Sequence, residues 1–246
     1  SFPVGHAQII DMNSHCDTLL VCLQDVRVWS EQNPRHAPIW ISFNLKDQAI
    51  PGLPDPELFT PEALNLLDEQ LRGALTAQLI QPADVRGLNW PTLAEARGKV
   101  LLILDEGGAK RDWYYNNWQT RPMFTNAPEG HPAAGVMIIN DPIEDFARIQ
   151  RLVKAGYLVR TRADAGTLEA RSNDTLRRDR AFASGAQAIS TDYYRAATHF
   201  GNDYRVAIDG GVRCNPVLLP QPCVVAEYSG APLFRRVWQS INNEIH

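Results

Sequence analysis

The chain has 246 residues, of which 44% are hydrophobic and 21% are charged, and its formal net charge is −4. This length suits one large domain with a substantial core, and the charge excludes the basic field that nucleic-acid binding needs. No apolar run approaches the roughly 20 residues of a membrane helix. No signal peptide is visible at Ser1, so either a leader was removed or the start is missing.

Five short apolar runs predict strands, and a sixth run is weaker. A run such as Val-Leu-Leu-Ile-Leu is typical of a strand buried on both faces of a parallel sheet. In chain order the expected strands are 2–6 (the weaker candidate), 38–45, 99–105, 134–140, 157–162 and 187–191.

Apolar residues at helical spacing fill the gaps between these strands. The expected helices are 19–31, 61–79, 141–156 and 174–185. Thr60 and Pro61 form a start signal for the second helix, and Gly156 is a stop signal for the third. Strands and helices alternating at this spacing indicate parallel units with right-handed crossovers.

About six strand units are visible, whereas a closed (β/α)8 TIM-type barrel has eight. We expect residues 1–194 to form the C-terminal part of such a barrel and residues 195–246 to form a covering extension of the same domain. The shortfall predicts about two βα units before Ser1. An open, incomplete sheet is the alternative.

The four cysteines lie in two local pairs, Cys16 with Cys22 and Cys214 with Cys223. This spacing is not typical of a zinc site. Two local disulfides would indicate a secreted or periplasmic protein. The alternative is four buried thiols in a cytosolic protein.

Polar residues gather where two of the predicted strands end. Arg160 and Arg162 are two residues apart, so on a strand they point to the same face. Asp164 follows them, and Asp192 and Tyr193 follow the next strand. In a parallel barrel the active site lies at this end of the strands, and paired guanidinium groups suit a phosphate or a polyol. A surface ion-pair network around Asp164 is the alternative.

Several segments together resemble one known family, in their order and spacing more than in any single motif. The chain is similar to the calcium-dependent bacterial phosphatidylinositol-specific phospholipases C, within the phosphodiesterase barrels that include glycerophosphodiester phosphodiesterases. The resemblance covers residues 5–223. It is carried by Gly5-His6 with Asp11 and the first cysteine pair, and by 37–47, 81–87, 89–105, 121–124, 140–142, 156–194 and 213–216.

The resemblance implies cleavage of phosphatidylinositol-type lipids to diacylglycerol and a cyclic inositol phosphate, assisted by calcium. His6 matches one of the family's two histidines, and we expect it to act as the general acid. The other histidine and an acidic calcium-binding pair have no counterpart, so we expect them in a missing segment before Ser1. The implied partners are a phospholipid or inositol phosphodiester and, transiently, a membrane surface.

Further site residues follow from the same resemblance. Lys46, with the arginine pair and the polar residues described above, is expected to bind substrate, and the alternative for Lys46 is an ion pair with Asp47. Asn44 and Asp105 are expected to ligate calcium, although Asp105 could instead cap a helix entry. Asn44 replaces the family's usual glutamate, which weakens a calcium site because calcium affinity depends on carboxylate count.

Two questions stay open at this point. The aromatic loop 106–131, with Trp113 and Trp118, is interpreted as a lid or membrane-contacting rim, and packing over the barrel mouth is the alternative. The function could also be that of a glycerophosphodiester phosphodiesterase or of a non-catalytic inositol-phosphate or lipid-binding barrel. Asn44 favours the binding protein, whereas His6 and Lys46 favour an enzyme.

Overall fold

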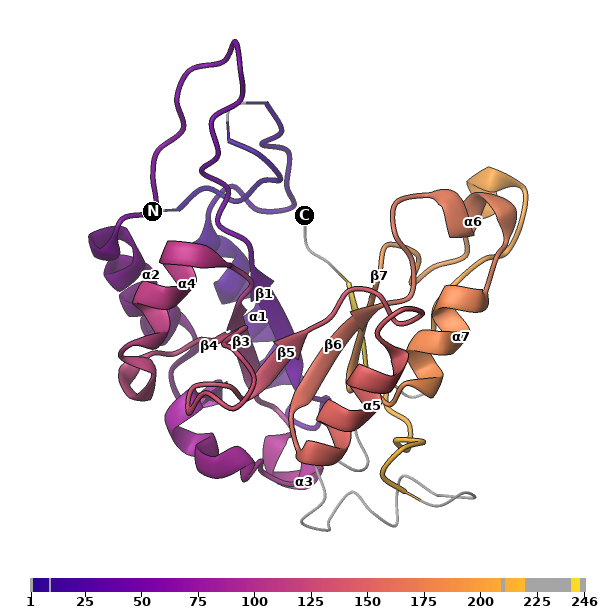
Figure 1. Ribbon diagram of the computed structural model, residues 1–246. Coiled ribbons are helices and arrows are strands. Elements are labelled where there is room, and N and C mark those ends of the chain that lie inside the picture. The colour runs from indigo at the N-terminus through magenta and orange to yellow at the C-terminus, as the bar shows by residue number, and fades with distance from the viewer. Residues whose placement is uncertain (1, 9, 209–210, 220–239, 244–246) are drawn as a thin grey trace. The chain divides into compact units, whose positions relative to one another are not determined.

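The structure is a computed structural model that describes residues 2–8, 10–208, 211–219 and 240–243 (Figure 1). The chain forms two compact units, each described here by itself. The first unit comprises residues 1–84 and 98–133, and the second comprises residues 85–97 and 134–245.

The first unit contains a parallel sheet built around β3 (Val100–Leu104), all of whose residues are buried. β1 (Ile39–Phe43) pairs with β3 along its whole length. β2 (Leu79–Ile80) pairs with the first two residues of β3, and β4 (Phe124–Thr125) pairs with the last two. The apolar run that forms β3 is therefore the centre of this unit's core, as a strand covered on both faces should be.

Three helices accompany this sheet: α1 (Leu19–Gln32), α2 (Pro61–Leu75) and α4 (Gly108–Tyr115). Two 3-10 turns, η1 (Thr76–Gln78) and η3 (Trp118–Thr120), follow α2 and α4. α2 begins where the sequence indicated, because the Thr60 side chain accepts a hydrogen bond from the backbone N–H of Ala63. Its leucines at helical spacing are buried. The helix ends at Leu75, earlier than the expected 79.

A buried ionic network joins α2 to α4 and to the segment before β4. Arg121 donates to Asp68 (2.9 Å) and to Asn65 (2.7 Å), and Tyr114 Oη donates to the other oxygen of Asp68 (2.6 Å). Burial raises the pKa of Asp68, and the hydrogen bonds from Tyr114 and Arg121 offset only part of that increase. The guanidinium of Arg121 also lies 4.5 Å from the centre of the Trp113 ring. The network therefore holds the end of α4 that carries Trp113 and Tyr114 against the core.

The second unit contains a parallel sheet in the order β5 (Val136–Ile138), β6 (Leu158–Arg162), β7 (Ala188–Thr191) and β8 (Ser240–Asn243). Its helical segments are α3 (Leu93–Ala96), α5 (Phe146–Ala155), α6 (Leu168–Ser172), α7 (Leu176–Ala183) and η4 (Thr198–Phe200). η2 (Pro82–Leu88) crosses the boundary between the units. α5 ends at Gly156, whose φ of 102° is left-handed and favours glycine.

The five main predicted strands are confirmed, and the weaker one at residues 2–6 is wrong. Pro3 forms only an isolated bridge with Thr18. The chain then turns back, because the backbone N–H groups of His6 and Ala7 both donate to the carbonyl of Asp11. The predicted C-terminal extension contributes β8, which pairs with β7 in parallel.

The architecture is mixed α/β with parallel sheets, as the sequence predicted, but the expected TIM-type barrel is not seen as a closed ring. The described strands form two separate four-stranded sheets. None of the helices in the described ranges is long and apolar enough to cross a membrane.

The first cysteine pair is confirmed as a disulfide between Cys16 and Cys22. It fastens the segment that carries His6 to the first turn of α1. For the second predicted pair, Cys223 lies outside the described residues.

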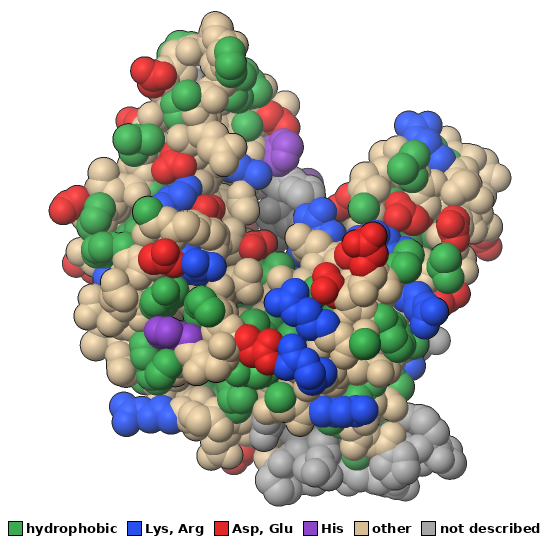
Figure 2. All heavy atoms as spheres, viewed as in Figure 1, with side chains coloured by type: hydrophobic (Ala, Val, Ile, Leu, Met, Phe, Trp, Pro, Cys, Tyr) green, Lys and Arg blue, Asp and Glu red, His purple; other side chains and the backbone are tan. Residues whose placement is uncertain are grey.

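Two loops of the first unit extend beyond its sheet: the N-terminal segment and the connection between β1 and α2 (Figure 1). Hydrophobic side chains are visible over the tip of this projecting region in Figure 2. The exposed hydrophobic residues of these two loops include Ile10 (56%), Ile50 (39%) and Leu58 (68%).

Candidate active site

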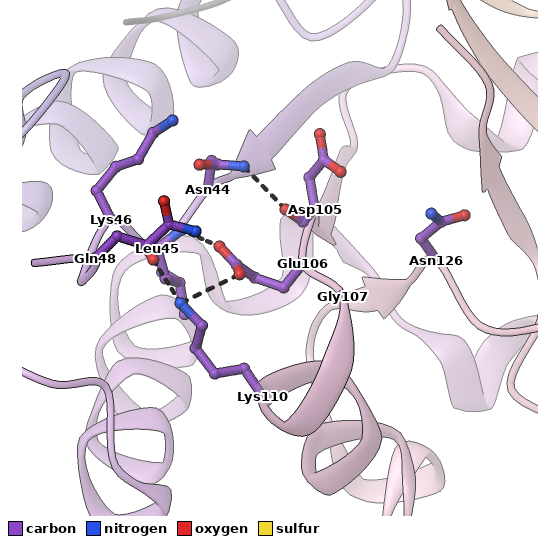
Figure 3. A pocket seen from close by; sticks show the side chains of 9 residues that line it. All are labelled: Asn44, Leu45, Lys46, Gln48, Asp105, Glu106, Gly107, Lys110 and Asn126. Atoms are coloured by element: carbon purple, nitrogen blue, oxygen red, sulfur yellow. Dashed lines mark hydrogen bonds and ion pairs between the residues drawn. The ribbon is translucent and has the colours of Figure 1, made fainter.

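A polar cavity of about 380 Å³ lies where the strands of the first unit end (Figure 3). Asn44 and Lys46 follow β1, Asp105 and Glu106 follow β3, and Asn126 follows β4. The strands are parallel, so their carboxyl ends bring these residues to one edge of the sheet, where α/β proteins bind ligands. The structure thus brings Asn44, Lys46 and Asp105 to one cavity.

Lys110, from the first turn of α4, holds one wall of this cavity in place. Its Nζ donates to the carbonyl of Leu45 (2.7 Å) and to Asp47 Oδ1 (2.7 Å), and it lies 3.2 Å from Glu106 Oε2. The other oxygen of Glu106 accepts a hydrogen bond from the backbone N–H of Leu45. These contacts use the donors of the ammonium group and fix the chain on both sides of Lys46.

Asp47 also belongs to this wall of the cavity. Burial alone would raise the pKa of its carboxyl. The hydrogen bonds from Lys110 and from the backbone N–H of Phe59 outweigh burial, so the pKa lies below the ordinary value of an aspartate. Asp47 therefore pairs with Lys110 rather than with Lys46, which overturns the ion pair considered for Lys46 from the sequence. Lys46 is exposed, and its side chain points away from Glu106 and Lys110 (Figure 3).

Replacing Lys110 with methionine should therefore destabilise the protein. The variant leaves two largely buried carboxylates, Asp47 and Glu106, without their cation, and we expect a loss of about 2–3 kcal/mol in the free energy of unfolding. Urea denaturation measures this loss. The matched control is Lys46→Met, whose effect should stay within about 0.5 kcal/mol because the side chain is exposed.

The pH dependence of Lys110→Met gives a second check. The lowered pKa of Asp47 contributes stability above the ordinary pKa of an aspartate, and that contribution is lost as the pH falls through the lowered value. The variant should lack this contribution, so its deficit relative to the wild type should shrink in acid. A deficit independent of pH would contradict the assignment.

His6 lies in a turn that presents it with a carboxylate partner. Its Nδ1 is 3.2 Å from Asp11 Oδ2, and backbone hydrogen bonds between residues 6, 7 and 11 close the turn. A proton on Nδ1 is thus directed at Asp11. The partnership was not predicted, although the five-residue spacing in one short segment was a signal for it.

A second cavity, of about 200 Å³, is lined by His6 and shares Lys46 and Gln48 with the first. Gln8 joins the two regions. Its amide nitrogen donates to the carbonyls of Lys46 (2.6 Å) and Glu57 (3.0 Å), and its amide oxygen accepts from the N–H of Glu57 (3.0 Å). His6 and Lys46 are therefore held on adjoining walls.

The remaining predicted site residues lie in the second unit. The side chain of Arg160 is buried and donates to Asn140 Oδ1, while Arg162 is half-buried at the end of β6. Arg177, from α7, donates to Asp141 and to the carbonyl of Asn140. The arginine pair thus lies at the carboxyl end of β6 beside the residues that follow β5.

Asp164 links the ends of β6 and β7. Its carboxylate accepts hydrogen bonds from Thr191 Oγ1 (2.5 Å) and from the backbone N–H of Asp192 (3.0 Å). Burial raises the pKa of Asp164, and these hydrogen bonds oppose the increase. Tyr193 is buried and packs edge-to-face on Tyr204, with ring centres 5.7 Å apart. The expected site residues are therefore divided between the units.

The residues of the polar cavity do not make a calcium site by themselves. Calcium takes six to eight oxygen ligands and gains affinity from carboxylates. Glu106 already accepts hydrogen bonds from Leu45 and pairs with Lys110, and Asn44 Nδ2 donates to the carbonyl of Asp105. Two ammonium groups line the same cavity. Across the described ranges no group of three or more His, Cys, Asp or Glu side chains is placed to hold a metal.

The central side chains of the aromatic loop 106–131 pack inside the first unit. It contains α4, η3 and β4. Tyr114 is fully buried, and Trp113 is half-buried beneath Arg121. These two side chains are therefore packed within the first unit, and the lid or membrane-contacting rim stays a prediction.

The fold and this cavity define an α/β protein with its polar site at the carboxyl ends of parallel strands. The sequence model of one family, Ca²⁺-dependent phosphoinositide phospholipase C, matches residues 1–216, and the chain belongs to that family. No curated protein sequence matches the chain.

Two solved structures are similar to the chain, both of a calcium-dependent phosphoinositol-specific phospholipase C from a Pseudomonas species. An apo form described with a myoinositol complex has 19% identity and a TM-score of 0.44, covering 58% of this chain and 57% of that one. A second apo crystal form has 18% identity and a TM-score of 0.46, covering 61% of each chain. The chain thus matches less than two thirds of the length of either.

Proposed function

We propose that the protein cleaves the phosphodiester bond of phosphoinositide lipids, releasing diacylglycerol and a cyclic inositol phosphate. The observation that carries the proposal is the placement of the His6–Asp11 pair and of Lys46 on adjoining cavities. Proton transfer and stabilisation of phosphoryl charge are the two tasks of this reaction, and an imidazole and an ammonium group suit them. Membership of the phospholipase C family supports the substrate class.

In the proposed reaction the inositol 2-hydroxyl attacks phosphorus, and the bond to the diacylglycerol oxygen breaks. Protonated His6 donates a ring proton to that leaving oxygen, while Asp11 holds the imidazole through its contact with Nδ1. Lys46 stabilises the negative charge on the non-bridging oxygens. We assign His6 to the leaving-group side of the reaction only, and we propose that the proton of the attacking 2-hydroxyl is taken by the family's other histidine, which has no counterpart in this sequence.

The other residues expected from the sequence stay proposals. We propose that Arg160, Arg162, Asp164, Asp192 and Tyr193 contribute to substrate binding. Their polar groups follow parallel strands of one sheet, which supports the proposal.

Asn44 and Asp105 are our candidates for oxygen ligands of the family's calcium, which would need ligands beyond those of the described residues. No step above depends on calcium.

We further propose that the fold belongs to the TIM-type phosphodiesterase barrels, with residues 1–194 as the C-terminal part of the barrel and residues 195–246 as an extension. The parallel pairing of every described strand supports this. Secretion or export to the periplasm is proposed from the Cys16–Cys22 disulfide, since such bonds persist in oxidising compartments.

The test is phosphorus NMR of the purified protein with phosphatidylinositol micelles, with calcium and again with a chelator. A cyclic inositol phosphate signal is the expected result, and its loss with the chelator would show that the family's calcium is required. If the protein instead cleaves only the deacylated substrate glycerophosphoinositol and releases glycerol phosphate, it is a glycerophosphodiester phosphodiesterase.

A second function, non-catalytic binding of an inositol phosphate or lipid, is favoured by one observation. The cavity is lined by an amide, Asn44, and by the ammonium group of Lys46, while the carboxylate of Glu106 is paired with Lys110, and this composition suits an anion better than calcium. No turnover by folded protein, together with saturable binding of inositol 1-phosphate in calorimetry, would establish this function and rule out the enzyme.

A further inference from the structure

The two cavities of the first unit differ in chemistry although they share a boundary. The cavity at the strand ends is lined by amides, carboxylates and ammonium groups. Beyond Lys46 and Gln48, the cavity beside His6 is bounded largely by apolar side chains of the loop between β1 and α2. These apolar side chains are Ile50, Leu53, Pro54 and Pro56.

The apolar wall is fixed by hydrogen bonds at both ends. Gln8 binds the backbone at Lys46 and at Glu57, and Asp47 accepts from the N–H of Phe59. Between these points the chain turns tightly, because the N–H of Leu53 donates to the carbonyl of Ile50 (3.0 Å). Because the wall is already ordered, a ligand that binds against it loses little free energy to ordering of the loop.

A phosphoinositide has the same division of chemistry. A polyol lies on one side of its phosphate, and an esterified glycerol lies on the other. Lys46 lines both cavities, so a phosphate near Lys46 has the polar cavity on one side and the apolar cavity on the other. His6, the proposed donor to the leaving oxygen, lines the apolar cavity. The leaving group is therefore expected on that side.

We propose that the apolar cavity beside His6 is a subsite for the leaving group, and that it binds the glycerol backbone and first acyl carbons of a diacylglycerol. This inference rests on the proposed function. The occupant is one lipid molecule in the cavity, not the surface of a bilayer. Burial of its acyl carbons against Ile50 and Leu53 provides the binding free energy.

The test compares two soluble substrates that share a headgroup, glycerophosphoinositol and monomeric dihexanoyl-phosphatidylinositol. Leu53→Ser should lower kcat/KM roughly tenfold on the acylated substrate, since small apolar contacts discriminate substrates by this amount, and should lower it far less on glycerophosphoinositol, which lacks the acyl carbons. Ile50→Ser should act in the same direction. The matched control is Leu58→Ser, which lies on the same loop outside the cavity and is 68% exposed.

A binding measurement separates this inference from the proposed function. Dihexanoylglycerol, titrated into the wild-type protein and the three variants by NMR, should bind the wild type and Leu58→Ser and should bind Leu53→Ser and Ile50→Ser more weakly. If the wild type binds dihexanoylglycerol in this pattern but cleaves neither substrate, the proposed function fails and the subsite stands.

The subsite is overturned by equal losses on both substrates, by an equal effect of Leu58→Ser, or by wild-type protein that cleaves lipid without binding dihexanoylglycerol. Should Leu53→Ser fail to fold, Ile50→Ser carries the test, because its side chain is already 39% exposed.

Discussion

Alanine in place of His6 is expected to lower kcat on phosphatidylinositol by roughly 10²- to 10⁴-fold, the usual contribution of a positioned general acid. The physical reason is that the diacylglycerol oxygen must otherwise leave as an alkoxide. KM should change little, because the imidazole is assigned to the transition state and not to headgroup binding. Initial rates from phosphorus NMR over a range of substrate concentrations separate the two constants.

Two companion variants make the His6 result specific. His15→Ala removes another exposed histidine from the same segment and should leave the rate unchanged. Asp11→Asn keeps the size of the carboxylate but removes its charge, and kcat should fall by less than in His6→Ala because the imidazole is retained. A His6→Ala enzyme with nearly full activity would remove histidine from the mechanism proposed here.

The largest stability effect is expected for Arg121→Met. Arg121 and Asp68 are both buried, 7% and 3% exposed, and the substitution leaves the carboxylate of Asp68 without its cation. Loss of one partner of a buried ion pair costs about 3–5 kcal/mol. Urea denaturation should show this loss as a lower midpoint. Arg111→Met is the control, because the pair that it removes, with the exposed Asp112, is worth at most about 1 kcal/mol.

The Arg121→Met deficit should also depend on pH. Burial already raises the pKa of Asp68 above its usual range, and removal of Arg121 takes away an opposing influence, so the pKa should rise further. A raised folded-state pKa means that stability is retained below the unfolded pKa and is lost as the pH rises through the folded value. The variant should therefore be closer to wild type in acid than at neutral pH, and the opposite trend would contradict the network.

The sequence predicts the longer elements of this fold well and the two-residue strands poorly. β3 is an unbroken apolar run, and α2 carries leucines at helical spacing, so each pattern had one clear reading. β2 has only two residues, and Leu79 continues the helical spacing of Leu71 and Leu75, so the expected helix ran to the first residue of the strand. β4 is equally short, and no period is defined in two residues. Their strand state comes from pairing with β3, which the local sequence does not encode.

The sequence predicts those site residues that directly follow a strand. Asn44, Lys46 and Asp105 meet because parallel strands finish at one edge. The role of Lys110 was hidden, since its acceptors lie more than sixty residues earlier at Leu45 and Asp47. Side chains that bridge distant segments leave no periodic signal, and a lone lysine or glutamine in a sequence normally indicates only an exposed surface.

Gln8 fixes both ends of the loop between β1 and α2 by hydrogen bonds, so the residues between these ends can be replaced without moving the ends. The fixed points lie at Lys46 and Glu57, outside the tip, and the closure entropy of a flexible loop grows only slowly with its length. Sequences grafted between residues 48 and 56 should therefore leave His6, Lys46 and the strand ends in place. A library confined to this tip would vary the apolar wall while keeping the polar groups of the two cavities constant.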